Sequence, residues 1–259
     1  MSQGDINAEE FDFTPYYGVF TDCSRNFKRI SDGLAEFIDN SIQACGEDPS
    51  VPTKVKISFH LGASERDDSF VVIYDNGCGM DQTELKQFAV HSLSYEARKK
   101  RGDVERSSAN SVKISKFGVG AKEAAFYLGS RLRVISKKKT AATVSEFVID
   151  KEELDRKWRE EKNTSGLYKG AIEVREAGDV TKVSVDGVEH FPAMLSEFRE
   201  HERHDQFTYL VIRLYKHMYQ RLKGPEYLET LSQLSAIYHF YLHPEHLPHV
   251  LCDQFRRYC

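Results

Sequence analysis

The chain has 259 residues, and its 36 basic and 40 acidic side chains leave a net charge of −4. This near-neutral balance disfavours a protein whose main role is to wrap a polyanion, because no global positive field attracts one. Five cysteines without a CxxC pair argue against a disulfide framework and a zinc ribbon. No apolar run reaches the roughly 20 residues that a membrane span requires, and the acidic N-terminus is unlike a signal peptide. The composition therefore predicts a soluble intracellular protein with one large or two small domains.

The first half of the chain combines amphipathic segments with a glycine loop. Residues 1–24 are polar and aromatic by turns, and we expect them to form an arm that packs on another surface. The glycine loop at 76–80 is followed by Asp81, a residue type suited to the N-cap of a short helix. Apolar spacing predicts a helix over 25–45, a hairpin of strands over 55–60 and 70–75, and a helix over 81–90.

A polar stretch then interrupts the pattern. Residues 91–116 are rich in Ser, Lys and Arg and carry few large apolar groups, so we expect a functional lid or a disordered segment there. A second glycine loop at 117–120 opens a helix that ends near Leu128. The remaining predicted strands cover 132–136, 146–149, 171–174, 182–185 and 207–214, and the remaining helices cover 151–161, 191–203 and 227–241.

Two polar residues on the first predicted helix are candidates for chemistry. Glu36 and Asn40, in the stretch EFIDN, lie within about 40° of each other on a helix, opposite its apolar stripe. A carboxylate can polarise water as a general base, and an amide oxygen is a hard ligand suited to Mg²⁺. Taken alone, the pair is also typical of the solvated face of an amphipathic helix.

A second candidate motif, DNGCGM, begins at Asp75 at the end of a β-rich run. A buried carboxylate at a strand end can accept a hydrogen bond from an exocyclic amine such as that of adenine. Gly77 and Gly79 would let the backbone approach a flat ring closely. An ordinary Asn-Gly turn would have the same local sequence.

The third motif, FGVGAK, contains Gly118, Gly120 and Lys122 at the start of a predicted helix. Glycine-rich backbone at a helix N-terminus offers unpaired N–H groups and the positive end of the helix dipole to phosphate, and the lysine adds a cation. The spacing matches neither the P-loop nor the dinucleotide-binding fingerprint. By itself the motif is a weak signal.

The order of the three motifs is more informative than any one of them. A helix with ExxDN, a strand with DNGxGM, a polar lid and a helix opened by GxGxK resemble the gyrase, histidine kinase and MutL (GHKL) class of ATP-binding domains. Within that class, EFIDNS, DNGCGM and FGVGAKEAAFYLG are similar to the eukaryotic chromatin ATPases. The closest resemblance is to the structural-maintenance-of-chromosomes flexible-hinge-domain-containing family, and the next is to the microrchidia family. The similarity extends through HSLSYEAR, LRVISK, FTYLVIRL and LSQLSAIYHFYLHP, so it covers most of residues 17–245.

The resemblance implies roles for individual residues. Glu36 matches the general base for the hydrolytic water, and Asn40 matches the ligand of a Mg²⁺ ion that bridges the triphosphate of ATP. Asp75 matches the carboxylate that reads adenine. Thr208 matches a late threonine near the adenine and its water, although Phe207 precedes it where the family usually has glycine. The other matches are Gly77, Gly79 and Met80 at the base pocket, and Gly118, Val119, Gly120, Ala121 and Lys122 on the phosphate side.

The resemblance also implies a fold and domain limits. The implied fold is α+β, a two-layer α/β sandwich (the Bergerat ATP-binding fold) with a mixed, mostly antiparallel sheet and helices on one face. We expect the ATP-binding domain to span 25–243, with its lid at about 91–116 and a C-terminal tail at 244–259. We expect the family's transducer domain, whose lysine reaches the γ-phosphate, to be absent. Hydrolysis without that charge is expected to be slow.

The implied function is ATP binding and slow ATP hydrolysis in a chromatin-associated, nuclear protein. We expect lid closure and homodimerisation on ATP, and a role in gene silencing or chromosome organisation. Contacts with chromatin or nucleic acid are expected through regions outside this chain, and none with a membrane. The alternative is a nucleotide-gated dimerisation module without meaningful turnover. A histidine kinase would need a phosphoacceptor hairpin that is not apparent, and chaperones or mismatch-repair proteins resemble the rest of the chain less.

Overall fold

The computed structural model describes residues 9–13, 27–45, 52–89, 120–139, 141–160, 168–179, 191–203 and 206–242. Four predicted features lie outside these residues: the lid at 91–116, the loop positions 117–119, the strand at 182–185 and the tail at 244–259.

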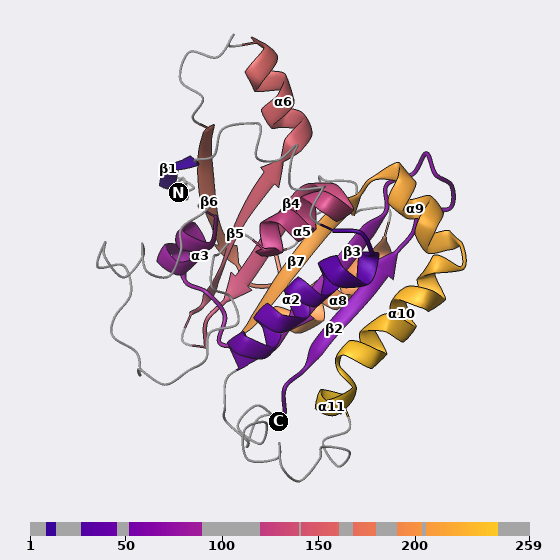
Figure 1. Ribbon diagram of the computed structural model, residues 1–259. Helices are drawn as coiled ribbons and strands as arrows, with labels where there is room; N and C mark the ends of the chain where they lie inside the picture. The colour runs from indigo at the N-terminus through magenta and orange to yellow at the C-terminus, as the bar shows by residue number, and fades with distance from the viewer. Residues whose placement is uncertain are drawn as a thin grey trace.

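One seven-stranded sheet forms the centre of the fold, with the strand order β1-β6-β5-β4-β7-β3-β2 (Figure 1). Its strands are β1 (Glu9–Phe13), β2 (Val55–His60), β3 (Phe70–Asp75), β4 (Gly129–Lys137), β5 (Thr143–Asp150), β6 (Tyr168–Glu176) and β7 (Phe207–Leu214). Every pairing among these described strands is antiparallel, whereas the resemblance implied a mixed sheet. The predicted hairpin of β2 and β3 is confirmed, and part of the predicted arm forms β1 on the edge of β6.

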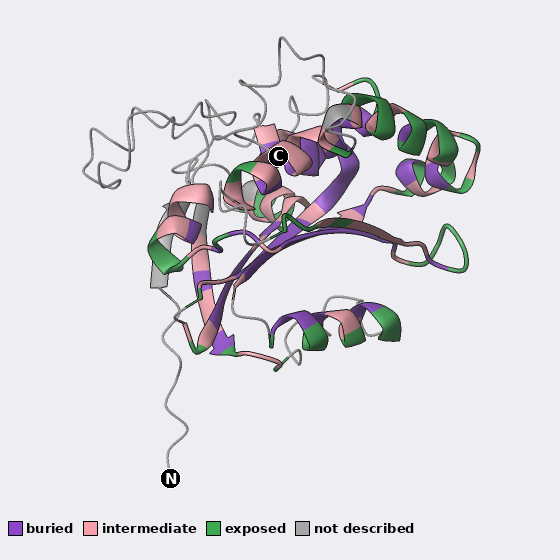
Figure 2. Ribbon diagram, turned by 90° about the horizontal axis from the view of Figure 1, so that it is seen from below, coloured by how far each residue is buried: buried purple, intermediate pink, exposed green. Residues whose placement is uncertain are grey.

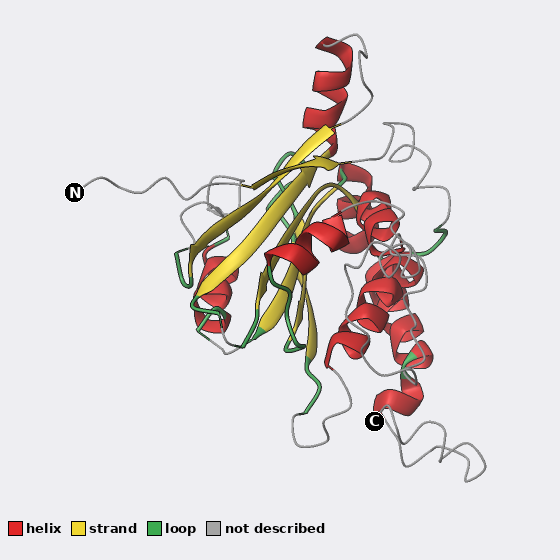
Figure 3. Cartoon of the chain, turned by 90° about the vertical axis from the view of Figure 1, so that its left-hand side faces the viewer, coloured by secondary structure: helices red, strands yellow, loops and turns green. Residues whose placement is uncertain are grey.

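Most helices cover one face of this sheet, which we call the helix face (Figure 3). The helices are α2 (Ile30–Cys45), α3 (Gln82–Ala89), α5 (Gly120–Leu128), α6 (Lys151–Glu160), α8 (Pro192–His201), α9 (Lys216–Lys223), α10 (Glu226–Ile237) and α11 (His239–Leu242). Asp81 is the N-cap of α3, as predicted, and it forms a capping box with Glu84, which was not predicted: Glu84 N–H donates to Asp81 Oδ1 at 2.9 Å, and Asp81 N–H donates to Glu84 Oε2 at 2.9 Å.

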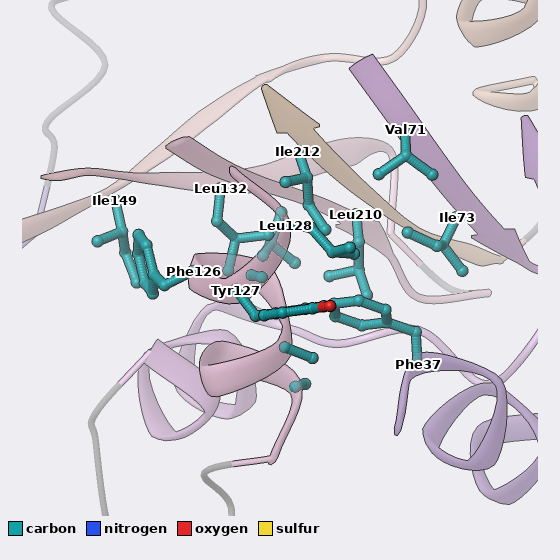
Figure 4. Close-up of a cluster of buried hydrophobic side chains, with 14 of the residues drawn as sticks. Phe37, Val71, Ile73, Phe126, Tyr127, Leu128, Leu132, Ile149, Leu210 and Ile212 are labelled. Atoms are coloured by element: carbon teal, nitrogen blue, oxygen red, sulfur yellow. The ribbon is translucent and has the colours of Figure 1, made fainter. Parts of the chain in front are cut away.

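The main core lies between the helix face and helices α2 and α5 (Figure 4). Side chains on β3 alternate between faces, so Val71 and Ile73 point toward this core on the side of Phe37 of α2, whereas Phe126 of α5 lies beside Ile149 of β5. Helices α2 and α5 approach closely at Gly33, where a Cβ atom would lie 3.3 Å from the ring of Tyr127. The close packing fixes the position of α2, which carries the first candidate motif.

A single described helix, α8, covers the opposite face of the sheet (Figure 2). Met194 and Phe198 of α8 pack on a second buried cluster that includes Phe70, Val72 and Tyr209. The α+β sandwich is therefore confirmed, but the expectation that helices lie on one face only is wrong for α8. The physical reason is that all six residues of β3 are buried, so this strand is apolar on both sides and both need a cover.

Candidate functional site

Asp75, the last residue of β3, is a buried carboxylate at the edge of the main core. It is 5% exposed. Ser41 Oγ on α2 donates to its Oδ2 at 3.0 Å, and Gly77 N–H donates to its Oδ1 at 2.9 Å. Burial raises the pKa of Asp75 to about 6, and the two hydrogen bonds oppose that shift. The side chain is thus held in one orientation without a cation to neutralise it among the described residues.

The loop after Asp75 is wedged between α2 and the end of β4. A Cβ atom on Gly77 would lie 2.7 Å from Ala44 Cβ, and Cys78 N–H donates to Ala44 O at 2.8 Å. Gly79 has a φ of +65°, and a Cβ atom there would lie 2.0 Å from Lys137 O. Both glycines are therefore required by close backbone approach, and Gly79 also by its left-handed conformation.

Three polar residues form a row across the end of the sheet on the helix face. Thr208 on β7 is the register partner of both Asp75 on β3 and Ser136 on β4. Residues directly opposite one another share a face, so the three side chains are neighbours. Ser136 Oγ lies 3.1 Å from Thr208 Oγ1 and accepts a hydrogen bond from Met80 N–H at 2.8 Å. The row therefore joins the glycine loop to β7.

Glu36 on α2 meets the start of α5. A Cβ atom on Gly120 would lie 2.1 Å from Glu36 Oε2, so the carboxylate lies against the glycine backbone. Burial, followed by the charges of Asp39 and Glu123, raises the pKa of Glu36. The side chain is half-buried, which differs from the solvated position that its helical spacing also allowed. The structure thus brings the first and third motifs together.

The remaining predicted residues are placed as follows. Asn40 is half-buried on α2, one turn after Glu36, and Ala121 is buried on α5. Gly118 and Val119 lie outside the described residues. Helix α2 therefore carries Glu36 near one end of the site, Asn40 in the middle and Ser41 against Asp75.

Lys122 is oriented toward α3. The side chain is 1% exposed, and its Nζ donates to Phe88 O at 2.6 Å and lies 4.9 Å from the centre of the Phe88 ring. A cation near the last carbonyl groups of a helix is favourable because it meets the negative end of the helix dipole. In this conformation Lys122 links α5 to the C-terminal end of α3, the helix that directly precedes the predicted lid.

Sequence reasoning missed two hydroxyl groups and one phenol at this site. Ser41 and Ser136 were part of the quoted stretches EFIDNS and LRVISK, but no role was assigned to them. Tyr238, which follows α10, donates to Asp39 Oδ1 at 2.7 Å and anchors α2 from its outer side. The position of Ser41 directly after Asn40 was a usable signal. The roles of Ser136 and Tyr238 depend on contacts between residues distant in sequence.

The site residues fit a nucleotide better than a protein-only metal centre. Among the described residues, no group of three or more His, Cys, Asp and Glu side chains is arranged to hold a metal ion. Mg²⁺ at nucleotide sites usually takes only one or two protein oxygen ligands and completes its shell with phosphates and water. The Asn40 amide and the Glu36 carboxylate could supply such oxygens, while Asp75 supplies a buried acceptor beside the glycine loop.

The profile of a protein family described as histidine kinase-, DNA gyrase B- and HSP90-like ATPase matches residues 29–180. The chain belongs to this ATPase family, as the motif order predicted. It is also 32% identical over 254 residues to the human protein named structural maintenance of chromosomes flexible hinge domain-containing protein 1, and equally to the mouse protein of that name. The alignment covers 91% of this chain and 12% of each relative, so the chain spans about an eighth of their length. Within the part of the chain that the structure describes, no helix is both long and apolar enough to span a membrane.

Proposed function

We propose that this chain binds ATP with Mg²⁺ at the site formed by α2, the 76–80 loop and the start of α5, and that it hydrolyses ATP slowly. The observation that carries the proposal is the convergence of the three motifs on α2. Ser41 of this helix holds Asp75, and Glu36 of the same helix lies against Gly120. Membership in the ATPase family supports nucleotide binding independently.

Each part of the site has a separate task in this proposal. Asp75 accepts a hydrogen bond from the exocyclic amine of adenine, with Gly77, Gly79 and Met80 beside the base and Thr208 next to it. The phosphates are assigned to residues 118–122, of which 120–122 open α5 and can offer the N–H groups of a helix N-terminus. When bound, Mg²⁺ would neutralise charge on the triphosphate, and the Asn40 amide oxygen would be its protein ligand.

Glu36 is the proposed general base for the hydrolytic water. Its half-buried position and the nearby carboxylates raise its pKa, and a base with a raised pKa accepts a proton more readily near neutral pH. In this role Glu36 takes a proton from a water molecule as the water attacks the terminal phosphate. Its place against Gly120 puts the carboxylate beside the backbone proposed to face the phosphates.

The cellular role is inferred from similarity alone. The names of the human and mouse relatives refer to the maintenance of chromosomes, and we infer from this a nuclear, chromatin-associated function in silencing or chromosome organisation for the present chain. ATP binding would order the lid at 91–116 and favour a homodimer, so that turnover resets a clamp. Light scattering after size-exclusion chromatography would test this: ATP, but not ADP, should give a dimer.

Glu36→Gln separates binding from hydrolysis. We expect titration calorimetry with Mg²⁺ to give an ATP affinity within about threefold of the wild type, while phosphate release falls by about 10²-fold or more because the general base is lost. Glu229→Gln, an exposed carboxylate on α10, is the matched control and should leave both quantities unchanged.

Asn40→Ala tests the metal-ligand role, and it should weaken Mg²⁺-dependent ATP binding by about tenfold or more. Equal ATP affinity in the wild type and Asn40→Ala would contradict this assignment. If the wild type binds ATP but releases phosphate no faster than the Glu36→Gln variant, the nucleotide-gated module without turnover is the better description.

A further inference from the structure

Ser136 makes three polar contacts with a single hydroxyl group. Its side chain is fully buried. The Oγ atom lies 2.8 Å from Met80 N, which donates, 3.0 Å from Phe207 O, which can only accept, and 3.1 Å from Thr208 Oγ1. A serine oxygen has one proton and two lone pairs. All three contacts are satisfied at once only if Ser136 donates to Phe207 O and accepts from Met80 and Thr208.

This arrangement fixes the direction of the Thr208 hydroxyl. Because its proton is used on Ser136, only its lone pairs remain to meet a ligand. Thr208 lies in register with Asp75, and an ionised carboxylate also only accepts hydrogen bonds. The Asp75 oxygens already accept hydrogen bonds from Ser41 Oγ and Gly77 N–H, and these bonds hold the carboxylate in place. The Thr208 hydroxyl and the Asp75 carboxylate, which are neighbours at this end of the sheet, therefore both offer hydrogen-bond acceptors to a ligand, and neither offers a donor.

We propose that Ser136 is a positioning residue for base recognition: by accepting the Thr208 proton, it makes this corner of the site select a 6-amino purine over a 6-oxo purine. The inference rests on the proposed function, because it assumes that the base lies beside Asp75. An exocyclic amine donates hydrogen bonds to such acceptors. The 6-oxo group of hypoxanthine would instead place its own lone pairs against them, and an unpaired buried polar group is strongly unfavourable.

Ser136→Ala is the variant that tests this assignment. Without the Ser136 oxygen, the Thr208 hydroxyl is free to turn and to donate to an oxo group. We expect calorimetry with ATP and inosine triphosphate to show at least tenfold preference for ATP in the wild type. The variant should bind ATP about threefold to tenfold more weakly and inosine triphosphate no more weakly, so the preference should fall by about tenfold.

The matched control is Ser145→Ala. Ser145 is a buried serine on β5 in register with Ser136, on the side away from Thr208, and its loss should change neither affinity. If Ser136→Ala does not fold, Thr208→Val provides the second test. It leaves the Ser136 contacts with Met80 and Phe207 in place but removes one acceptor, so it should lower the preference through weaker ATP binding.

The possible outcomes separate this inference from the proposed function. Equal weakening of ATP and inosine triphosphate by Ser136→Ala would assign a merely structural role and overturn the inference. Equal affinity of the wild type for the two nucleotides, or an unchanged preference in Thr208→Val, would also overturn it while leaving ATP binding intact. Failure of the wild type to bind either nucleotide would contradict the proposed function itself.

Discussion

The two faces of the sheet differ in whether their buried carboxylates are paired with a cation. On the face covered by α8, Arg133 donates to Glu146 at 2.8 Å, and Arg175 contacts Glu146 at 3.2 Å and Glu202 at 2.7 Å. All four side chains are buried, and each carboxylate has an arginine partner. On the helix face, the carboxylates of Glu36 and Asp75 have raised pKa values, and no cation among the described residues pairs with either.

This difference separates structural charges from functional ones. A closed network of two arginines and two glutamates is internally neutral, so it is compatible with a dry interior. A buried carboxylate without a cation lowers the stability of the folded protein, and such groups concentrate at functional sites. The unpaired carboxylates on the helix face thus lower the stability of the folded protein, whereas the paired ones on the α8 face do not. A ligand that donates hydrogen bonds or brings a cation would offset this loss of stability.

The largest effect on stability is expected from breaking the buried network of arginine and glutamate side chains on the face covered by α8. Glu202→Ala leaves Arg175 buried without its main partner, and we expect the free energy of unfolding to fall by about 3–5 kcal/mol. Urea denaturation measures the change. Glu200→Ala, an exposed position near the end of α8, should change it by less than about 0.5 kcal/mol. A similar small loss in Glu202→Ala would show that the network is not the neutral structural unit described above.

A slightly smaller effect, of opposite sign, is expected at Asp75. Its pKa rises from 3.8 to about 6 on folding, so the folded state holds the proton more tightly and stability falls as the pH rises from about 4 to 6. Asp75→Asn does not titrate, so its unfolding free energy relative to the wild type should increase by about 3 kcal/mol across that window. Unfolding curves without nucleotide at several pH values measure this gap. A gap that does not vary with pH would contradict the burial argument.

The smallest effect on stability is expected at Gly120. The three atoms nearest to a Cβ atom there all belong to the Glu36 carboxyl group, the movable end of a side chain, so Gly120→Ala should change the unfolding free energy by less than about 0.5 kcal/mol. The displaced carboxylate should nevertheless lower phosphate release by about tenfold or more. Gly224→Ala, whose Cβ atom would meet its nearest neighbours at 3.5 Å, is the control for both measurements. Unchanged phosphate release in Gly120→Ala would show that the position of the Glu36 carboxylate does not matter for hydrolysis, and would contradict its role as the general base.

Local patterns predicted most of the described elements but neither β1 nor α9, and the contacts of Ser136 and Lys122 with residues distant in sequence were missed as well. Apolar spacing identified α2 and the β2–β3 hairpin because each carries its own periodic signal. The amphipathic stripe of α8 indicated that the helix packs, but not on which side of the sheet it lies. Ser136 gained a role only through the register of β4 and β7, since Thr208 lies 72 residues away along the chain. Lys122 was predicted to face phosphate, whereas the structure directs it to Phe88 O, a contact that no local pattern specifies.

The position of β7 has a consequence for how the protein folds. This strand, the last of the sheet in chain order, lies between β4 and β3 and joins two halves that would otherwise both have open edges (Figure 1). Such long-range pairing slows folding, because the entropy of closing a large loop must be overcome before the contacts form. During synthesis on the ribosome, the row of Asp75, Thr208 and Ser136 cannot form until β7 has emerged. Until then the exposed edges of β3 and β4 are available for incorrect pairing and are natural targets for chaperones.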